Sequence, residues 1–288
     1  MDRHLRTYLD SFKVPGYFWS TFLIDVLFFG LFWQAFSRFS RYLENKNVEI
    51  LGGRSVEQIQ QLLVGSPEQA LPYVQQLQSY LLSALGGLAV LAIAAFLLFS
   101  LAQGLIWNLL HQKKLTAKTY WRWNALQLAL IIPLLLYALA AQIVKLMVTA
   151  LLGGMTRLSP AVYLNNAVLI DALLLTLDKA VSLLLLLLAL TILFLIYYQF
   201  AQHYRVWSSI GRGLSLVKTH WASIWRMILL MATTAVLPAF MLIPLQKAFF
   251  LYPTAETILI FAVSLLFLAW MRFYMVKVIH GHPASSAQ

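Results

Sequence analysis

The feature that most constrains this chain is a run from Gln69 to Gln112 in which no Asp, Glu, Lys or Arg occurs. A helix needs roughly 20 apolar residues to cross the hydrocarbon core of a bilayer, so the run is about twice as long as one span requires. The composition agrees, because 61% of the residues are hydrophobic and 11% are charged, against about 25% charged in soluble domains. Disordered, collagen-like and disulfide-stapled classes are excluded, and the sequence predicts an all-α polytopic membrane protein.

Six segments meet the length requirement for a span, and we interpret the chain as a single integral membrane domain. They are residues 17–36, 80–110, 123–146, 181–200, 227–245 and 258–278. Helices are expected rather than barrel strands, since barrel strands alternate over about 10 residues. In the last span, Arg272 and Lys277 are expected to snorkel to the interface. A four-span arrangement, with the first and last segments lying in the interface, stays open.

Two longer segments, residues 37–79 and 147–180, are expected outside the membrane as a small helical cap. Ser55 and Ser66 each precede a Gln by three residues, the capping-box spacing that starts a helix. In the second segment, Asp171 and Asp178 are seven residues apart and share a helical face. They could bind a cation or act as an acid/base pair, but a solvated surface is the favoured interpretation. Lys145 is a candidate ion-pair partner for either carboxylate.

The basic residues divide unevenly between the two sides of the predicted spans. Lys and Arg are retained on the cytoplasmic side of short loops. The side that holds both termini carries 13 of the 21 basic residues and only two acids, Asp2 and Asp10, so the whole formal charge of +11 lies there. The 13 are Arg3, Arg6, Lys13, Lys113, Lys114, Lys118, Arg122, Arg205, Arg212, Lys218, Arg226, Arg272 and Lys277. This pattern predicts a multi-pass protein of the cell membrane with both termini in the cytoplasm.

Tryptophan reinforces this orientation, because indole rings prefer the headgroup level. Eight of the nine fall near the predicted inner boundary: Trp19, Trp107, Trp121, Trp123, Trp207, Trp221, Trp225 and Trp270. One interpretation is an ordinary anchoring belt. The other is a collar that binds anionic lipid headgroups, each nearby Lys or Arg contributing about 1 kcal/mol. The collar consists of Lys113, Lys114, Lys118, Trp121, Arg212, Lys218 and Trp221.

Part of the collar repeats along the chain. Trp107 precedes residues 118–121 (Lys-Thr-Tyr-Trp) at the same spacing as Trp207 precedes residues 218–221 (Lys-Thr-His-Trp). Residues 11–19 form a fainter third copy. The repeat predicts three helical hairpins that each enter the membrane from the cytoplasm, although coincidence at interfaces rich in Lys and Trp stays an alternative.

The glycine-bearing loop at residues 210–218, followed by an aromatic entry into a span, resembles a group of poorly characterised six-helix prokaryotic membrane proteins. The group includes the membrane domain attached to some glycerophosphodiester phosphodiesterases. The catalytic module of those enzymes is a separate soluble barrel that nothing here could encode. The resemblance therefore implies an architecture and no activity, and no functional residue is carried over.

Asp25 is the most informative single residue, because it lies inside the first span and intramembrane carboxylates are costly. It could carry a proton or a cation, or it could pair with Arg226 or Lys118 in a structural role. We favour the structural role, and Asp25 and Arg226 form the candidate intramembrane polar site.

No nucleophile elbow, phosphate-binding loop or zinc-protease motif occurs, and there is no cysteine. We therefore expect no catalytic, cofactor-binding or metal site and no enzymatic activity. Nucleic acid is not an expected partner, since the orientation rule already accounts for the charge. The leading hypothesis is a non-enzymatic accessory or scaffold protein associated with membrane lipid and with a protein partner. The alternative is a small transporter or channel subunit, in which Asp25 and the prolines Pro133, Pro238 and Pro244 shape a polar pathway.

Overall fold

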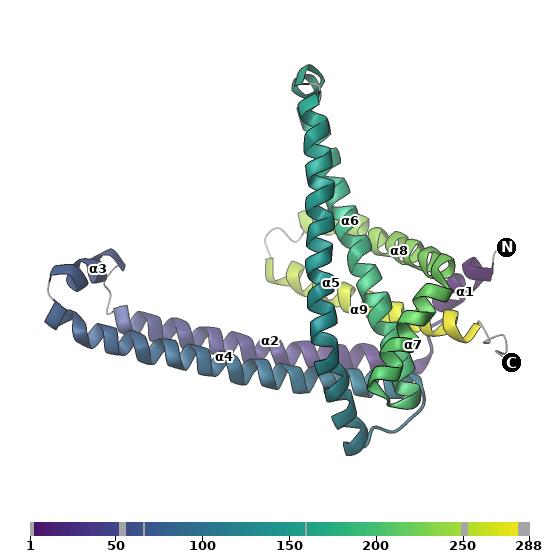
Figure 1. Ribbon diagram of the computed structural model, residues 1–288, viewed down its shortest axis with the longest axis horizontal. Coiled ribbons are helices and arrows are strands. Elements are labelled where there is room, and N and C mark those ends of the chain that lie inside the picture. Colours follow the sequence, from purple (N-terminus) through teal and green to yellow (C-terminus); the bar gives the residue numbers. More distant parts are fainter. Residues whose placement is uncertain (1–2, 52–55, 66, 159, 249–252, 282–288) are drawn as a thin grey trace. The chain divides into compact units, whose positions relative to one another are not determined.

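The computed structural model describes residues 3–51, 56–65, 67–158, 160–248 and 253–281, and nearly all of them are helical (Figure 1). No strand occurs in these ranges, so the all-α prediction is confirmed. The helices are α1 (Arg3–Ser11), α2 (Gly16–Leu51), α3 (Val56–Gly65), α4 (Pro67–Leu110), α5 (Ala117–Leu158), α6 (Pro160–His203), α7 (Val206–Thr219), α8 (Trp221–Ala248) and α9 (Pro253–Gly281).

Within the described ranges, five helices are long and apolar enough to cross a membrane: α2, α4, α5, α6 and α9. A sixth span exists only if α7 and α8, which meet at an 88° bend, are counted together. The predicted fifth span, residues 227–245, lies within α8 alone. The chain is thus an all-α membrane protein, and its described residues supply five candidate spans, or six with the bent pair.

The helices run well beyond the predicted spans. Residues 37–51, expected in the outer segment, continue α2 without a break, because this stretch holds no Gly or Pro and is rich in good helix formers. The extension before residue 80 is part of α4, and α5 continues through Pro133. Of the predicted cap, α3 is a separate short helix, whereas residues 147–158 and 160–180 belong to α5 and α6. The two capping serines lie outside the described residues.

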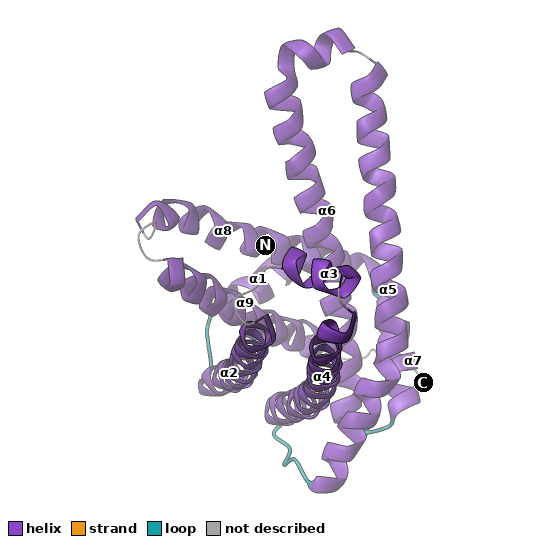
Figure 2. Cartoon of the chain, turned by 90° about the vertical axis from the view of Figure 1, so that its left-hand side faces the viewer, coloured by secondary structure: helices purple, strands orange, loops and turns teal. Residues whose placement is uncertain are grey.

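The contacts divide the chain into two compact units, which we describe separately. Unit 1 comprises residues 1–22 and 103–288, and unit 2 comprises residues 23–102. In unit 2, the long helices α2 and α4 lie side by side (Figure 2). Phe39 of α2 lies over Gly87 of α4 so closely that a Cβ on residue 87 would clash with its ring. Phe28 and Phe99 form a second aromatic contact between the two helices, with ring centroids 5.6 Å apart.

Unit 1 contains two hairpins, α5 with α6 and α8 with α9 (Figure 2). Its core lies at one end of these hairpins, where Trp107, Trp123 and Tyr274 are fully buried. Farther along α5 the apolar side chains are exposed, as Leu135 at 65% and Leu139 at 61% show. Contiguous exposed apolar surface of this kind requires a cover such as lipid or another protein. The hairpins therefore join at a packed end and expose apolar surface along their length.

Candidate functional site

The collar lies on two repeated segments of unit 1, which we name the first junction (residues 107–121) and the second junction (residues 207–221). The first connects α4 to α5, and the second comprises most of α7 and the entry to α8. Both end on an exposed tryptophan, with Trp121 at 64% and Trp221 at 51% exposure. Lys118 and Lys218, which stand three residues earlier, are exposed as well. At this end the two copies of the repeat are alike.

The other end of the repeat differs, because α4 and α6 stop at different places relative to the repeated tryptophans. In the first junction α4 passes Trp107 and ends where Gln112 adopts a φ of 54°. The amide of Gln112 donates to the carbonyl of Leu109 at 3.0 Å, and the amide of Lys113 donates to that of Asn108 at 2.8 Å. This pair of hydrogen bonds is the Schellman motif, which satisfies carbonyls that a helix end leaves unpaired.

In the second copy the helix stops before the tryptophan. Tyr204 adopts a φ of 52° and its amide donates to the carbonyl of Phe200 at 2.7 Å, which ends α6 with a single left-handed residue. Trp207 therefore starts a new helix, α7. As a result Trp107 has no exposed surface and Trp207 is 77% exposed.

Hydrogen bonds connect these two helix ends. The Lys113 ammonium donates to the carbonyl oxygens of Ala201 at 2.8 Å and Gln202 at 3.0 Å, both in the last turn of α6. The Tyr204 hydroxyl donates to Oδ1 of Asn108 at 2.5 Å, in the last turn of α4. A cation at a helix C-terminus pairs with the last carbonyls and with the negative end of the helix dipole. Lys113, predicted as a lipid contact, is thus a cap for α6.

Helix α7 packs one small-residue face on α6 and exposes the other. Ser209 and Gly213 are buried, and a Cβ on Gly213 would meet the Ile196 side chain at 2.7 Å and its backbone at 3.0 Å. Only glycine fits this approach, so the orientation of α7 about its axis is fixed. Trp207 and Leu214, the latter 48% exposed, then face outward.

Helix α7 also carries exposed charge. Arg212 and Lys218 are both exposed, Lys218 in line with Trp207 and Leu214 and Arg212 farther around the helix. At the start of α8 Trp221 and Trp225 stack with ring centroids 5.9 Å apart. Residues 111–122 and 203–226 contain no Asp or Glu. The collar, extended by Trp207, Leu214 and Trp225, is therefore basic and aromatic with no acidic residue in its own segments.

The predicted tryptophan belt is divided by the structure. Trp19, Trp121, Trp207, Trp221 and Trp225 are exposed, consistent with anchoring. Trp107, Trp123 and Trp270 are buried in unit 1, with at most 6% exposure, and cannot anchor to headgroups. The two groups share sequence context and differ in which face of the helix they occupy.

Arg272 corrects a second expectation. It does not snorkel, because its side chain is 2% exposed and its guanidinium lies 5.3 Å from the centre of the Phe194 ring, a cation–π contact. In the same core Tyr197 donates from its hydroxyl to Oε1 of Gln127 at 2.8 Å. Two polar residues inside an apolar helix, Asn124 and Gln127, were the sequence signal for this buried polar core.

The two residues of the candidate intramembrane polar site belong to different units. Asp25 is buried, with 1% exposure, whereas Arg226 is exposed on α8. Asp25 belongs to unit 2 and Arg226 to unit 1, so their pairing stays a prediction. The expected ion pair of Asp178 is confirmed, since its carboxylate lies 3.5 Å from the Lys145 ammonium. Among the described residues, no three His, Asp or Glu side chains are grouped to hold a metal.

Comparison with known proteins adds no relative. No protein family model matches the chain, and no curated protein or solved structure is detectably similar to it. The resemblance to the membrane domain of glycerophosphodiester phosphodiesterases stays a prediction.

Proposed function

We propose that this protein is a non-enzymatic accessory or scaffold protein of the cell membrane, which holds anionic lipids of the cytoplasmic leaflet at its collar. Both termini are then cytoplasmic. The observation that carries the proposal is the exposed face of α7 with the neighbouring helix starts, where Trp207, Arg212, Lys218 and Trp221 are all exposed and their segments contain no carboxylate.

The geometry of α7 supports a position in the headgroup layer. A helix that lies in the interface has apolar and aromatic side chains on one face and Lys or Arg beside them. Helix α7 has this distribution, and it turns by 88° from α8, the direction expected of a helix in the plane of the membrane when its neighbour crosses it. Trp207 and Leu214 would enter the acyl boundary while Arg212 and Lys218 stay with the phosphates.

The apolar surface along the hairpins supports the scaffold part of the proposal. Helices α4 and α5 have spanning windows in which no residue is buried within the protein. In a membrane such a surface contacts either lipid acyl chains or a partner membrane protein. Copurification of a partner from native membranes after mild solubilisation is the expected result.

The lipid part is tested by native mass spectrometry of the full chain after incubation with phosphatidylglycerol or phosphatidylcholine. The variant replaces Lys114, Lys118, Arg212 and Lys218 by Gln. The control replaces Arg38, Arg41, Lys145 and Lys179 by Gln, four charges predicted on the opposite face. We expect the first variant to retain fewer phosphatidylglycerol molecules, by about fivefold for each charge that contacts a phosphate. Equal retention of both lipids by the unmodified chain would contradict the proposal.

The orientation is tested with reporter fusions after Glu44 and after Lys113, which the proposal places on opposite sides of the membrane. Signals from the same compartment would overturn the topology and with it the assignment of the collar to the cytoplasmic leaflet.

A transporter or channel subunit is the second candidate, favoured by the 1% exposure of the Asp25 carboxylate. It predicts solute or proton flux in proteoliposomes that Asp25→Asn abolishes while the protein stays assembled. If the unmodified protein shows no flux and Asp25→Asn fails to assemble, the result supports a structural role for Asp25 instead.

A further inference from the structure

A cleft of about 520 Å³ lies in unit 1, where the chain leaves α4 just before the collar residue Lys113. It is formed by the first turn of α2, the end of α4 and the last turns of α9. Its polar lining comes from His111, Gln112 and Lys277, and its apolar lining from Leu110, Phe273 and Val276. No collar residue contributes to it.

The position of the cleft along the helices is that of a lipid headgroup. His111 and Gln112 directly follow the apolar stretch Leu71–Leu110, and Lys277 is in the final turn of the stretch Thr254–Ile279. Two apolar helices therefore end at the same cleft, and its lining combines apolar residues with polar ones that directly follow them in the chain. A ligand that fits both kinds of lining has an apolar part and a polar head.

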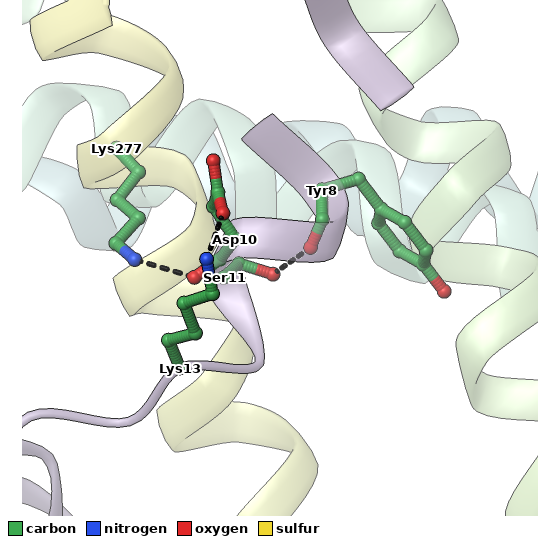
Figure 3. A network of polar contacts seen from close by, with 5 residues as sticks. All are labelled: Tyr8, Asp10, Ser11, Lys13 and Lys277. Carbon is green, nitrogen blue, oxygen red and sulfur yellow. Dashed lines mark hydrogen bonds and ion pairs between the residues drawn. The ribbon is translucent and has the colours of Figure 1, made fainter. Parts of the chain in front are cut away.

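The charge at the cleft selects an anionic head. The Lys277 ammonium lies 4.5 Å from the centre of the Phe273 ring and donates one hydrogen bond, of 2.6 Å, to the backbone carbonyl of Asp10. An ammonium has three protons, so two further donors remain. The neighbouring carboxylate of Asp10 is engaged by the Lys13 ammonium at 2.8 Å (Figure 3). This contact with Lys13 holds the pKa of Asp10 below its ordinary value. Two ammonium groups and one carboxylate leave this rim positive.

The same lysine holds the N-terminal helix in place. Besides the bond from Lys277, α1 is fixed by the Tyr8 hydroxyl, 2.7 Å from Oγ1 of Thr234, and by the Trp270 indole, which donates to the hydroxyl of Ser11 at 3.1 Å. The Phe12 ring stacks on Trp270 at 5.4 Å. Helix α1 therefore has contacts that persist without Lys277, which makes the lysine suitable for substitution.

We propose that the cleft binds a single anionic phospholipid, with its phosphate at Lys277 and its acyl chains against Leu110, Phe273 and Val276. The inference rests on the proposed function, since it names a discrete site for the class of lipid that the collar attracts. The collar gives graded binding of several lipids, whereas the cleft binds one.

The experiment counts lipids by native mass spectrometry of the full chain incubated with phosphatidylglycerol. The expected result is one lipid that stays bound at activation energies which remove the others. Lys277→Gln lowers the occupancy of this lipid by about fivefold or more, and Lys277→Arg retains it. Lys118→Gln, a collar variant that removes the same charge, retains the single lipid and loses weakly bound ones. Tyr8→Phe removes the hydrogen bond between α1 and Thr234. This variant is expected to retain the single lipid, which would show that the loss in Lys277→Gln does not come from weaker packing of α1.

Each other outcome contradicts the inference in a distinct way. Retention of the single lipid by Lys277→Gln overturns the cleft while leaving the collar proposal intact. Displacement of the lipid by an excess of soluble glycerol 3-phosphate shows a site for free phosphate esters and overturns the phospholipid assignment. A chain that retains neither kind of lipid overturns both proposals together.

Discussion

The first and second junctions share two tryptophans and a Lys-Thr pair at the same spacing, yet they place their leading tryptophans in opposite environments. Trp107 is fully buried and Trp207 is 77% exposed. The difference comes from one backbone event, the left-handed residue that ends the preceding helix. It follows Trp107 at Gln112 and precedes Trp207 at Tyr204. A sequence repeat therefore does not imply a structural repeat when the helix break within it moves.

The two junctions also have different tasks. The first supplies the cap and the hydrogen-bond partner that fasten α4 to the end of α6, through Lys113 and Asn108. The second has no such role and extends as α7, on which Trp207, Arg212 and Lys218 are exposed. The first is thus structural and the second is proposed to contact lipid. Paired substitutions at matched positions can break this distinction or sharpen it.

The largest contrast is expected between the two tryptophans. Trp107→Ala removes a fully buried ring and should lower the free energy of unfolding by about 3–5 kcal/mol. Trp207→Ala removes an exposed ring and should change it by less than about 0.5 kcal/mol. Thermal unfolding in one detergent measures both. Similar losses would show that α7 is covered by protein rather than lipid.

The next contrast is between two glycines of α7. Gly213→Ala forces a Cβ to within 2.7 Å of the Ile196 side chain and should destabilise the packing of α7 by about 1–3 kcal/mol. Gly211→Ala is the control, because nothing lies within 4 Å of its Cβ position, and it should stabilise the helix by about 0.5–1 kcal/mol. Trypsin cleavage after Arg212 reports the release of α7. Unchanged cleavage in Gly213→Ala would mean that α7 is not held on α6.

A smaller effect is expected from the cap. Lys113→Met removes two hydrogen bonds to the last carbonyls of α6 and should cost about 1–2 kcal/mol. Lys114→Met, at the exposed neighbouring position, should change stability little and lipid retention more. Thermal unfolding and lipid retention are measured for both variants. A larger loss of stability in Lys114→Met than in Lys113→Met would contradict the capping role of Lys113.

The smallest effect concerns the left-handed residues. Gln112→Gly should raise stability by about 1 kcal/mol, because glycine adopts a φ near 54° without the steric cost of a Cβ. Tyr204→Gly gains the same backbone freedom, but it loses the hydrogen bond to Asn108 and should give no net gain. Thermal unfolding of the two variants separates them, and a gain in both would show that the Asn108 bond contributes nothing.

The long helices could be predicted because chain length and polarity decide them locally. The run from Gln69 to Gln112 lacks any charged side chain, and α4 covers most of it. The ion pair of Lys145 with Asp178 could also be expected from the sequence, because both residues lie toward the same end of the α5–α6 hairpin. The helix ends were predicted less well. The predicted span ended where the apolar residues end, at residue 36, whereas α2 continues to Leu51 because residues 37–51 are mostly polar but contain no helix breaker.

In the candidate site, too, some features could be predicted from local sequence and others depend on distant residues. That Lys114, Lys118, Arg212 and Lys218 would be exposed follows from charge alone, because an unpaired cation is costly to bury. That Lys113 caps α6 and that Arg272 lies on Phe194 depends on residues more than 70 positions away in the chain, and no local pattern encodes such partners. The cleft at Lys277 likewise requires the ends of α2, α4 and α9 to meet.

The sequence by itself determined that this chain is a helical membrane protein and placed the candidate collar, since hydrophobic length and charge act residue by residue. The tertiary structure alone decided which tryptophan is core and which is surface, and which of the exposed lysines caps a helix. The physical reason is that a helical face is buried only when a second helix approaches it. That approach is set by Gly213 against Ile196 and by the break at Tyr204, not by the composition of the face.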